Sequence, residues 1–260
     1  MKRMKQLAAR HPRFGYRRIW ALLRAENYRM DGGEPVNVKR VHRLWKQEGL
    51  KVPKKQRKRR RLGHSGNSCT RCRAERVNHV WSYDFVMDQT TDGRRLKLLP
   101  VVDEYTRQCL AIEVERHLTA DDVVNTLRYL FELRGAPGFI RSDNGPEFIA
   151  LAVKAWLNQS GSQTLYIEPG SPWENAYCES FNGKLEDELL NREEFETLKE
   201  AKVLVEDWRL AYNHHRPHSS LNYMTPAAFA ATIMSQGPAP VATLPTPAPA
   251  TKQEHHPKLS

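Results

Sequence analysis

Three acidic residues have the type and placement that metal-assisted chemistry requires: Asp84, Asp143 and Glu179. Asp84 lies inside the strand-like stretch WSYDFV, among aromatic and β-branched residues. A carboxylate with such neighbours is costly to bury unless a cation or a metal ion neutralises it. Asp143 ends a short strand signal, GFIRSD, and the turn pair Asn144-Gly145 follows it. Functional groups in α/β sheets gather at strand ends of this kind.

The third acid, Glu179, lies in a predicted helix over residues 171–191. Apolar residues recur there every four positions and form the predicted core stripe, which consists of Tyr177, Phe181, Leu185 and Leu189. Glu179 falls well away from that stripe, and its same-face neighbours Ala176 and Gly183 are small. We therefore expect space beside this carboxylate for an ion and a substrate.

Carboxylates from a strand, a strand end and a helix are hard oxygen ligands that suit Mg²⁺ or Mn²⁺ and not zinc. Two such ions, about 3.5–4 Å apart, can activate an attacking oxygen and stabilise a leaving one in phosphodiester chemistry. Taken singly, acidic residues are more often surface charges than ligands, so the prediction depends on placement and spacing together. Rival carboxylates are Asp88 in the same strand and Asp103 beside a turn, where we expect a solvated or structural role.

The charge of the chain divides sharply along its length. Residues 1–76 hold 24 Lys and Arg against 5 Asp and Glu, a balance of +19, whereas residues 77–260 hold 17 against 25, a balance of −8. A basic front joined to an acidic body suggests an arm that binds a polyanion and a domain that uses carboxylates. The alternative interpretation is a solvated basic face, because charge alone names no partner.

The basic front contains two amphipathic helix patterns. The stretch FGYRRIWALLRAEN places Ile19 and Leu23 at helical spacing, and NVKRVHRLWKQEGL begins at a plausible N-cap, Asn37, and ends near Gly49. This pattern suits a helix-turn-helix-like module or any small basic helical hairpin. The run KVPKKQRKRRR, with eight basic residues in eleven, would bind phosphates in a salt-dependent way. The residues that we expect to contact DNA are Arg17, Arg18, Lys39, Arg40, Arg43, Lys46, Lys54, Lys55, Arg57, Lys58, Arg59, Arg60, Arg61, Asn144 and Lys184.

From Val77 onward, three strand signals run together and are followed by alternating helices and strands, which indicates an α/β layer with a mixed sheet. The expected domains are a helix-turn-helix-like domain over 1–50, a basic linker over 51–76, a catalytic core over 77–232 and a disordered tail rich in Pro and Ala over 233–260. The expected elements of the core are strands in 79–90, 94–103, 105–116, 138–143 and 164–170 and helices in 119–135, 148–161 and 171–191.

Several classes of protein are disfavoured by the composition. No apolar run reaches the length of a membrane span, and the first residues have no signal-peptide core, so we expect a cytoplasmic, nucleoid-associated protein without a membrane partner. Four cysteines give no disulfide framework. Cys69 and Cys72 form a CxxC pair, but the flanking histidines are irregularly spaced, which disfavours zinc.

Five stretches resemble the successive motifs of the integrase core: WSYDFV, VVDEYTR, IRSDNGPEF, SPWENAYCESFN and YNHHRPHSSLNYMTPAAF. More closely, they resemble bacterial insertion-sequence transposases of the IS-three type, the orfB product. The resemblance extends to about residue 232 and includes the front, where HPRFGYRRIWALLR and VNVKRVHRLWKQEGL are similar to that family's helix-turn-helix-like region. Asp143 and Glu179 are separated by 35 residues, the interval of the family's D,D(35)E signature.

The resemblance implies an RNase H-like core, with a mixed five-stranded sheet flanked by helices and preceded by a small all-α domain. It implies that Asp84, Asp143 and Glu179 are the catalytic residues and hold two Mg²⁺ ions, with Mn²⁺ as an alternative. The implied reaction is strand cleavage at an element end, followed by attack of the freed 3′-hydroxyl on a new phosphodiester. The implied partners are double-stranded DNA of the element ends and target, further copies of the chain on that DNA, and an upstream orfA helix-turn-helix protein or a frameshift fusion with it.

One position departs from the family pattern. The family usually has Lys or Arg seven residues after the catalytic Glu, where it would touch DNA, and here that residue is Glu186. Lys184 is nearby but points away from Glu179 at helical spacing. Two other functions therefore stay open, a DNA-binding regulator that has lost its activity and a nuclease that hydrolyses without joining.

Overall fold

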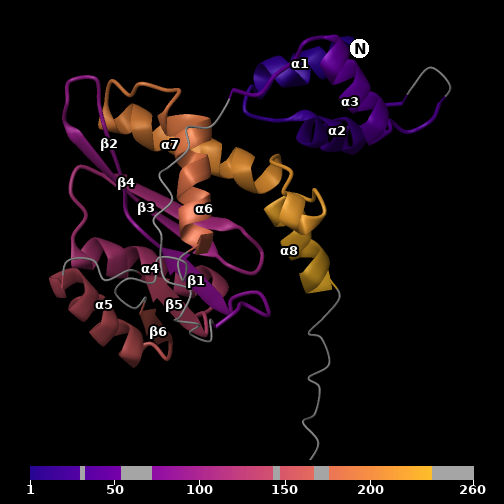
Figure 1. The fold of residues 1–260 in the computed structure, drawn as a ribbon. Coiled ribbons are helices and arrows are strands. Elements are labelled where there is room, and N and C mark those ends of the chain that lie inside the picture. The colour runs from indigo at the N-terminus through magenta and orange to yellow at the C-terminus, as the bar shows by residue number, and fades with distance from the viewer. Residues whose placement is uncertain (30–32, 54–71, 143–146, 167–175, 236–260) are drawn as a thin grey trace, which may run out of the picture.

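The structure of the chain is a computed structural model (Figure 1), and it describes residues 1–29, 33–53, 72–142, 147–166 and 176–235. Four groups of predictions lie outside the described residues: most of the basic linker, residues 143–146 with Asp143 and Asn144, residues 167–175, where the end of a strand and the start of a helix were expected, and most of the Pro- and Ala-rich tail. Within the described ranges, no helix combines the length and the apolarity needed to cross a bilayer.

Three helices form the N-terminal part: α1 (Lys2–Arg10), α2 (Tyr16–Ala25) and α3 (Val38–Gln47). The last two were predicted, and Asn37 caps α3 as expected, because its side chain accepts a hydrogen bond of 2.8 Å from the Lys39 N–H. Helix α1 was not predicted, although its Met4 and Leu7 pack with Ile19 and Trp45 in one small apolar core. We call α1–α3 the N-terminal helices.

One mixed sheet organises the rest of the chain. Its strands are β1 (Val80–Tyr83), β2 (Val86–Gln89), β3 (Arg95–Asp103), β4 (Cys109–Glu115), β5 (Phe139–Ser142) and β6 (Gln163–Tyr166). Strands β1 and β2 both pair antiparallel with β3, whose other edge pairs with β4, and β5 and β6 continue parallel to β1. The sequence predicted β1 and β2 as one strand, which is why five strands were expected and six are found in the described parts of the chain. The interruption falls at Asp84 and Phe85.

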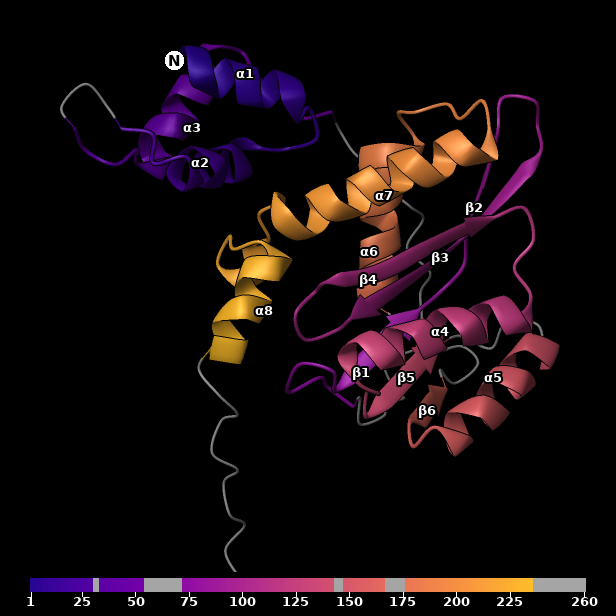
Figure 2. The same cartoon turned by 180° about the vertical axis from the view of Figure 1, so that it is seen from behind.

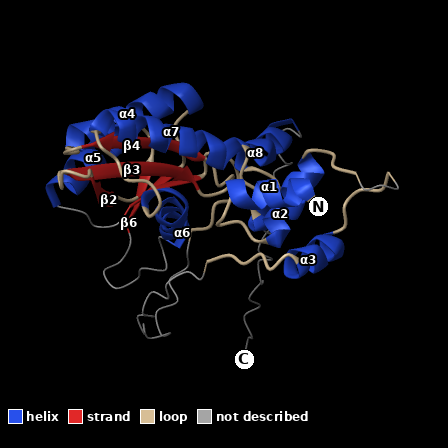
Figure 3. Cartoon of the chain, turned by 90° about the horizontal axis from the view of Figure 1, so that it is seen from above, coloured by secondary structure: helices blue, strands red, loops and turns tan. Residues whose placement is uncertain are grey.

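Helices cover both faces of this sheet, as Figure 3 shows from the sheet edge, with α4 (Ala120–Arg134) on one side and α6 (Ala176–Leu185) on the other. Side-chain alternation in the strands separates the two layers, since Leu99 packs on the α4 side and Leu98 on the α6 side. Helix α5 (Glu147–Gln159) joins α4 on its side.

Helix α6 does not end where its α-helical part ends. The five residues Glu186–Leu190 continue it as a π-helical turn, and α7 (Leu198–His214) then crosses the sheet and reaches toward the N-terminal helices (Figure 2). After a short 3₁₀ turn (Ser219–Leu221), α8 (Pro226–Ser235) follows. The sequence predicted neither α7 nor α8 as helices. We call the part from β1 to α8 the α/β core.

Candidate functional site

The first predicted carboxylate, Asp84, stands at the interruption between β1 and β2 and is half-buried. Asn182 of α6 donates a hydrogen bond of 3.1 Å from its Nδ2 to the Asp84 Oδ2. Because Asn182 is itself buried, the amide is fixed by its surroundings and holds the carboxylate in one orientation. Asp84 faces the α6 side together with Val86, whereas Tyr83 packs on the α4 side.

The second described carboxylate, Glu179, is exposed in the first turn of α6. It lies three residues before Asn182, and residues three apart lie on the same side of a helix. Asp84 therefore meets the side of α6 that carries Glu179. Asp143 lies outside the described residues, and it directly follows Ser142, the last residue of β5, which is the parallel neighbour of β1.

The rival carboxylates have other surroundings. Asp103 is buried and accepts backbone hydrogen bonds from Tyr105 (2.8 Å) and Asn78 (3.1 Å), so its role is structural and the alternative of a solvated group is wrong. Burial raises the pKa of Asp103, and these hydrogen bonds oppose that rise. Asp88 lies on β2, and burial likewise raises its pKa.

A buried ion pair that sequence reasoning missed supports the strand leading to Asp143. The Arg141 Nε lies 2.9 Å from the Glu104 Oε1, and both side chains are at most 4% exposed. Arg141 also donates to the carbonyl of Cys72 (2.7 Å). The Arg141 side chain therefore connects β5 to Glu104, which follows β3, and to Cys72 in the segment before β1. The sequence signal that could have indicated this ion pair was the arginine within the predicted strand GFIRSD.

Acidic residues of the π-helical turn contact the N-terminal helices. Arg13 forms a two-point ion pair with Asp187 through its Nε (2.9 Å) and its Nη2. Glu188 receives a two-point pair from Arg216 (2.6 and 2.8 Å) and a longer contact of 3.5 Å from Arg18. We call these five side chains the interdomain junction. Two-point pairs between guanidinium and carboxylate are specific in geometry as well as strong.

Aromatic rings also take part in the contact between the N-terminal helices and the α/β core. The guanidinium groups of Arg18 and Arg216 lie 5.1 and 5.8 Å from the Phe14 ring centre. Trp20 meets Tyr223 edge to face, with ring centres 5.8 Å apart. These contacts add to the ion pairs, so the arrangement of the N-terminal helices on the α/β core depends on both charge and ring packing.

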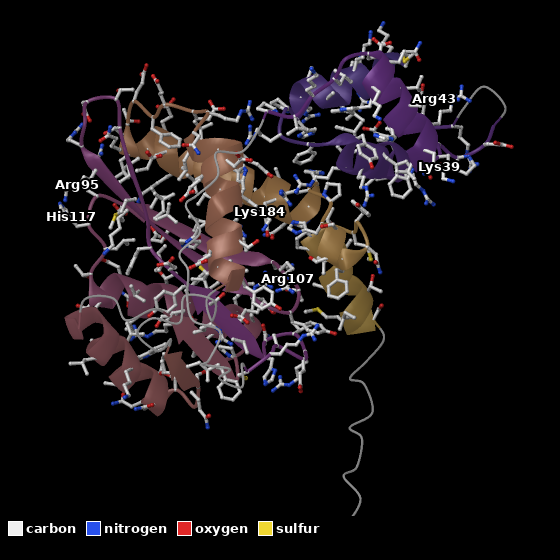
Figure 4. All side chains as sticks on the ribbon, in the orientation of Figure 1. Lys39, Arg43, Arg95, Arg107, His117 and Lys184 are labelled. Atoms are coloured by element: carbon white, nitrogen blue, oxygen red, sulfur yellow. The ribbon has the colours of Figure 1, made fainter. Side chains whose placement is uncertain are left out.

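The predicted DNA-contacting residues fall into three groups. Five are exposed on the N-terminal helices, and Figure 4 labels two of them on α3; they are Arg17, Lys39, Arg40, Arg43 and Lys46. Arg18 and Lys184 are half-buried, and Arg18 belongs to the interdomain junction. The remaining eight lie outside the described residues, namely Lys54, Lys55, Arg57, Lys58, Arg59, Arg60, Arg61 and Asn144.

Among the described residues, no group of three or more His, Cys, Asp or Glu converges on one point, and the CxxC pair is described only at Cys72. Cys69 lies outside the described residues. His218 is buried against the Tyr212 ring, and burial, reinforced by Arg216, lowers its pKa to about 2. His218 is therefore a neutral core residue.

A mixed sheet with helices on both faces, an acidic residue at the end of β1 and another on the helix packed against it define an integrase-type α/β core. In agreement, residues 74–172 and 160–226 match the Integrase core domain family, and residues 1–60 match the HTH-like domain family. A solved structure, the simian T-cell lymphotropic virus intasome with PP2A regulatory subunit B56 gamma, is similar in fold, with a TM-score of 0.52 and 15% identity over 90% of this chain and 80% of that one.

Two bacterial relatives are much more similar in sequence. The chain is 40% identical to an uncharacterized 31.7 kDa protein of insertion element IS407 from Burkholderia multivorans, over 92% of this chain and 83% of that protein. It is 42% identical to an uncharacterized 39.2 kDa protein of insertion element IS476 from Xanthomonas euvesicatoria, over 90% of this chain and 65% of that protein. The chain thus spans slightly less than two thirds of the IS476 relative. It belongs to the insertion-sequence transposase family of the IS-three type, as its motifs predicted.

Proposed function

We propose that the chain is a transposase that cleaves DNA strands at the ends of an insertion element and joins them to a target. The observation that carries the proposal is the hydrogen bond between Asn182 and Asp84, because it brings the first acidic residue against the helix that carries Glu179. Asp143 completes the proposed set from the position that follows β5. The N-terminal helices supply an exposed row of cations for the DNA backbone.

The donor set fits a divalent cation that prefers oxygen. Asp84 is half-buried beside apolar neighbours, Glu179 is exposed, and both offer hard carboxylate oxygens. We propose that these two residues and Asp143 hold two Mg²⁺ ions, for which Mn²⁺ could substitute. Bound there, the ions would supply Lewis-acid activation of the attacking and leaving oxygens of the phosphodiester.

The chain's own residues supply position and orientation. Asn182 fixes the Asp84 carboxylate, so that no side-chain rotation is needed when the substrate binds. The buried Arg141–Glu104 pair holds β5, and with it the start of the segment that carries Asp143. The cations of α3 bind backbone phosphates and keep the DNA on the protein while the reacting bond is placed at the carboxylates.

The decisive experiment incubates the protein with element-end DNA and Mg²⁺ and separates nicked from joined strands on a denaturing gel. Wild-type protein should give both products, and Asp143→Asn should give neither. Asp88→Asn is the matched control, since it removes a carboxylate of the same region that has no role in the proposed reaction. If Asp143→Asn cuts as well as the wild type, the assignment of the carboxylates is wrong.

The same gel separates the two alternative functions. DNA binding without any Mg²⁺-dependent cleavage identifies a regulator that has lost activity, and nicks without joined strands identify a nuclease. We propose further that several copies assemble on the DNA at the nucleoid, and that an orfA protein, separate or fused by frameshifting, supplies part of the end recognition. Adding that protein to the reaction should then raise cleavage at element ends over cleavage of unrelated DNA.

A further inference from the structure

A hollow of about 650 Å³ lies beside the β2–β3 hairpin. One wall consists of residues of β2 and β3, and the other is the segment 116–118, which connects β4 to α4. Cavities that bind small molecules in proteins usually measure about 300–1,000 Å³. The described lining of this hollow shares no residue with the proposed catalytic acids or with the residues expected to contact DNA.

The geometry of the strands places the basic residues of the hollow on one face. Lys97 of β3 lies opposite Met87 of β2 in the register, and Arg95 is two residues before Lys97. Side chains two apart in a strand point to the same face, which here is the α4 side, because Leu99 packs there. His117 approaches from the opposite wall, and Figure 4 shows it close to Arg95 in that view.

Lys97 keeps its charge uncompensated because the nearest acidic neighbour is engaged elsewhere. Glu115 of β4 lies opposite Lys97 in the register, but it forms an ion pair with Lys202 of α7. The Lys97 Nζ lies instead 3.8 Å from the centre of the Phe85 ring. A cation over a ring is attracted to it without being neutralised, so it remains able to bind an anion.

The other cations of the hollow have no acidic partner in the described parts of the chain either. The Arg116 Nη1 donates to the Thr90 hydroxyl (2.8 Å) and to the carbonyls of Arg94 (3.0 Å) and Arg95 (3.2 Å), all of which are neutral acceptors. The side chains of Arg95 and His117 are exposed, and neither makes a hydrogen bond or an ion pair with a described residue. These donors are therefore available to a ligand.

The charge of the hollow is strongly positive as a result. Asp88 is the single carboxylate of its described lining, against the full charges of Arg95, Lys97 and Arg116. His117 adds a further N–H donor. Cations that share one space repel one another, and a bound anion would relieve that repulsion. Guanidinium and ammonium groups are the usual partners of phosphate oxygens.

An apolar surface borders these cations. The side chain of Met87 is 64% exposed, and Leu118 lines the same hollow from the opposite wall. Methionine is polarizable and packs favourably against flat rings. A ligand that combines an anionic group with a compact apolar body therefore matches the hollow better than a bare anion does.

We propose that the hollow binds a small organic phosphate, whose phosphate group is held by Arg95, Lys97 and His117 and whose organic body lies against Met87. Arg116 supports the site, because it holds the hairpin turn from which Arg95 projects. The inference is independent of the proposed transposase function, since it needs neither DNA nor the acidic residues of the proposed reaction.

Isothermal titration calorimetry without DNA tests the site, at constant ionic strength and with three probes: AMP, inorganic phosphate and adenosine. AMP should bind as a one-to-one complex and about threefold or more tighter than inorganic phosphate, and adenosine should not bind. Arg95→Gln and Lys97→Gln should each weaken AMP binding about tenfold, because each removes a charged donor. Met87→Ser should weaken the binding of AMP and leave that of inorganic phosphate unchanged.

Arg94→Gln is the matched control, because Arg94 is an exposed arginine that pairs with Asp92 and does not line the hollow. Circular dichroism spectra and melting temperatures check that each variant is folded. AMP binding that is absent, or equal in wild type, Arg95→Gln and Lys97→Gln, overturns the site even if the protein cleaves DNA normally. Displacement of AMP by a mixed-sequence duplex at a lower phosphate concentration would assign the hollow to DNA and overturn a small-molecule ligand. AMP binding by a protein that never cleaves DNA supports the site and refutes only the proposed catalysis.

Discussion

The N-terminal helices and the α/β core differ in the side chains that they bury and in those that they expose. Among its described residues, the first part buries a cluster of nine apolar residues that includes Ile19 and Trp45, and it leaves a row of cations exposed on α3. The second part buries two apolar layers, one on each face of a sheet, and keeps polar groups at the break after β1. The cations that we propose to bind DNA lie in one part, and the carboxylates that we propose to be catalytic lie in the other.

The two parts meet through polar contacts. Arg13 and Arg18 reach Asp187 and Glu188, and the surrounding rings of Phe14, Trp20 and Tyr223 close the contact. Interfaces of this kind within a chain are more polar than permanent ones, and charge placement sets their register. The acidic π-helical turn therefore pairs with basic residues of the same chain.

The largest expected effect separates chemistry from binding. Asp84→Asn should reduce strand cleavage by at least about 10³-fold, because it removes a proposed metal ligand worth several kcal/mol in the transition state. DNA affinity, measured by anisotropy at the same salt, should stay within about twofold of wild type. Equal losses of cleavage and affinity would show that the two parts are not functionally separate.

The next effect concerns the junction itself. Glu188→Gln leaves the buried Arg216 guanidinium without its carboxylate, and such a change costs about 3 kcal/mol. Calorimetry should show a lower melting temperature and an earlier unfolding of the N-terminal helices. Glu194→Gln, at an exposed position of the following loop, is the control and should melt like wild type. A variant of Glu188 that melts with the control would mean that the Arg13–Asp187 pair and the ring contacts hold the parts together without it.

A smaller effect is expected from the residue that orients Asp84. Asn182→Ala removes one hydrogen bond to a carboxylate, worth about 1.5 kcal/mol, so cleavage should fall about tenfold. The Mg²⁺ concentration for half-maximal cleavage should rise as well, which a purely structural role would not produce. Asn125→Ala on the exposed side of α4 serves as the control. An unchanged Mg²⁺ requirement would contradict the positioning role of Asn182.

The smallest effect tests the departure from the family pattern. Glu186→Arg should raise strand transfer by a few-fold, about 1 kcal/mol, because a carboxylate near the DNA repels phosphate and a guanidinium attracts it. Strand transfer by the variant and by wild type is measured in single-turnover reactions at low salt. The gain in strand transfer should disappear as the salt concentration is raised. No gain at low salt would refute the idea that residue 186 faces DNA.

Local patterns predicted the elements between β1 and α6, apart from the break after β1. The apolar spacing of Val123, Leu127 and Leu130 predicted a helix over 119–135, and α4 covers Ala120–Arg134 with those three residues buried. Helix α1 was not predicted because it is short, and its buried side consists only of Met4, Leu7 and Ala8. The break after β1 had no signal in the sequence, since an alternating strand pattern continues through Asp84 and Phe85.

By itself, the sequence determined the order of strands and helices from β1 to α6 apart from the break after β1, the division of charge and the spacing of the proposed catalytic acids, because each depends on residues close together along the chain. Only the tertiary structure decided that Asn182 holds Asp84, 98 residues away, and that Asp187 pairs with Arg13, 174 residues away. The identity of each residue defines the charge and the hydrogen-bonding groups of its side chain. Which partner satisfies them is settled when packing brings distant segments together and excludes water.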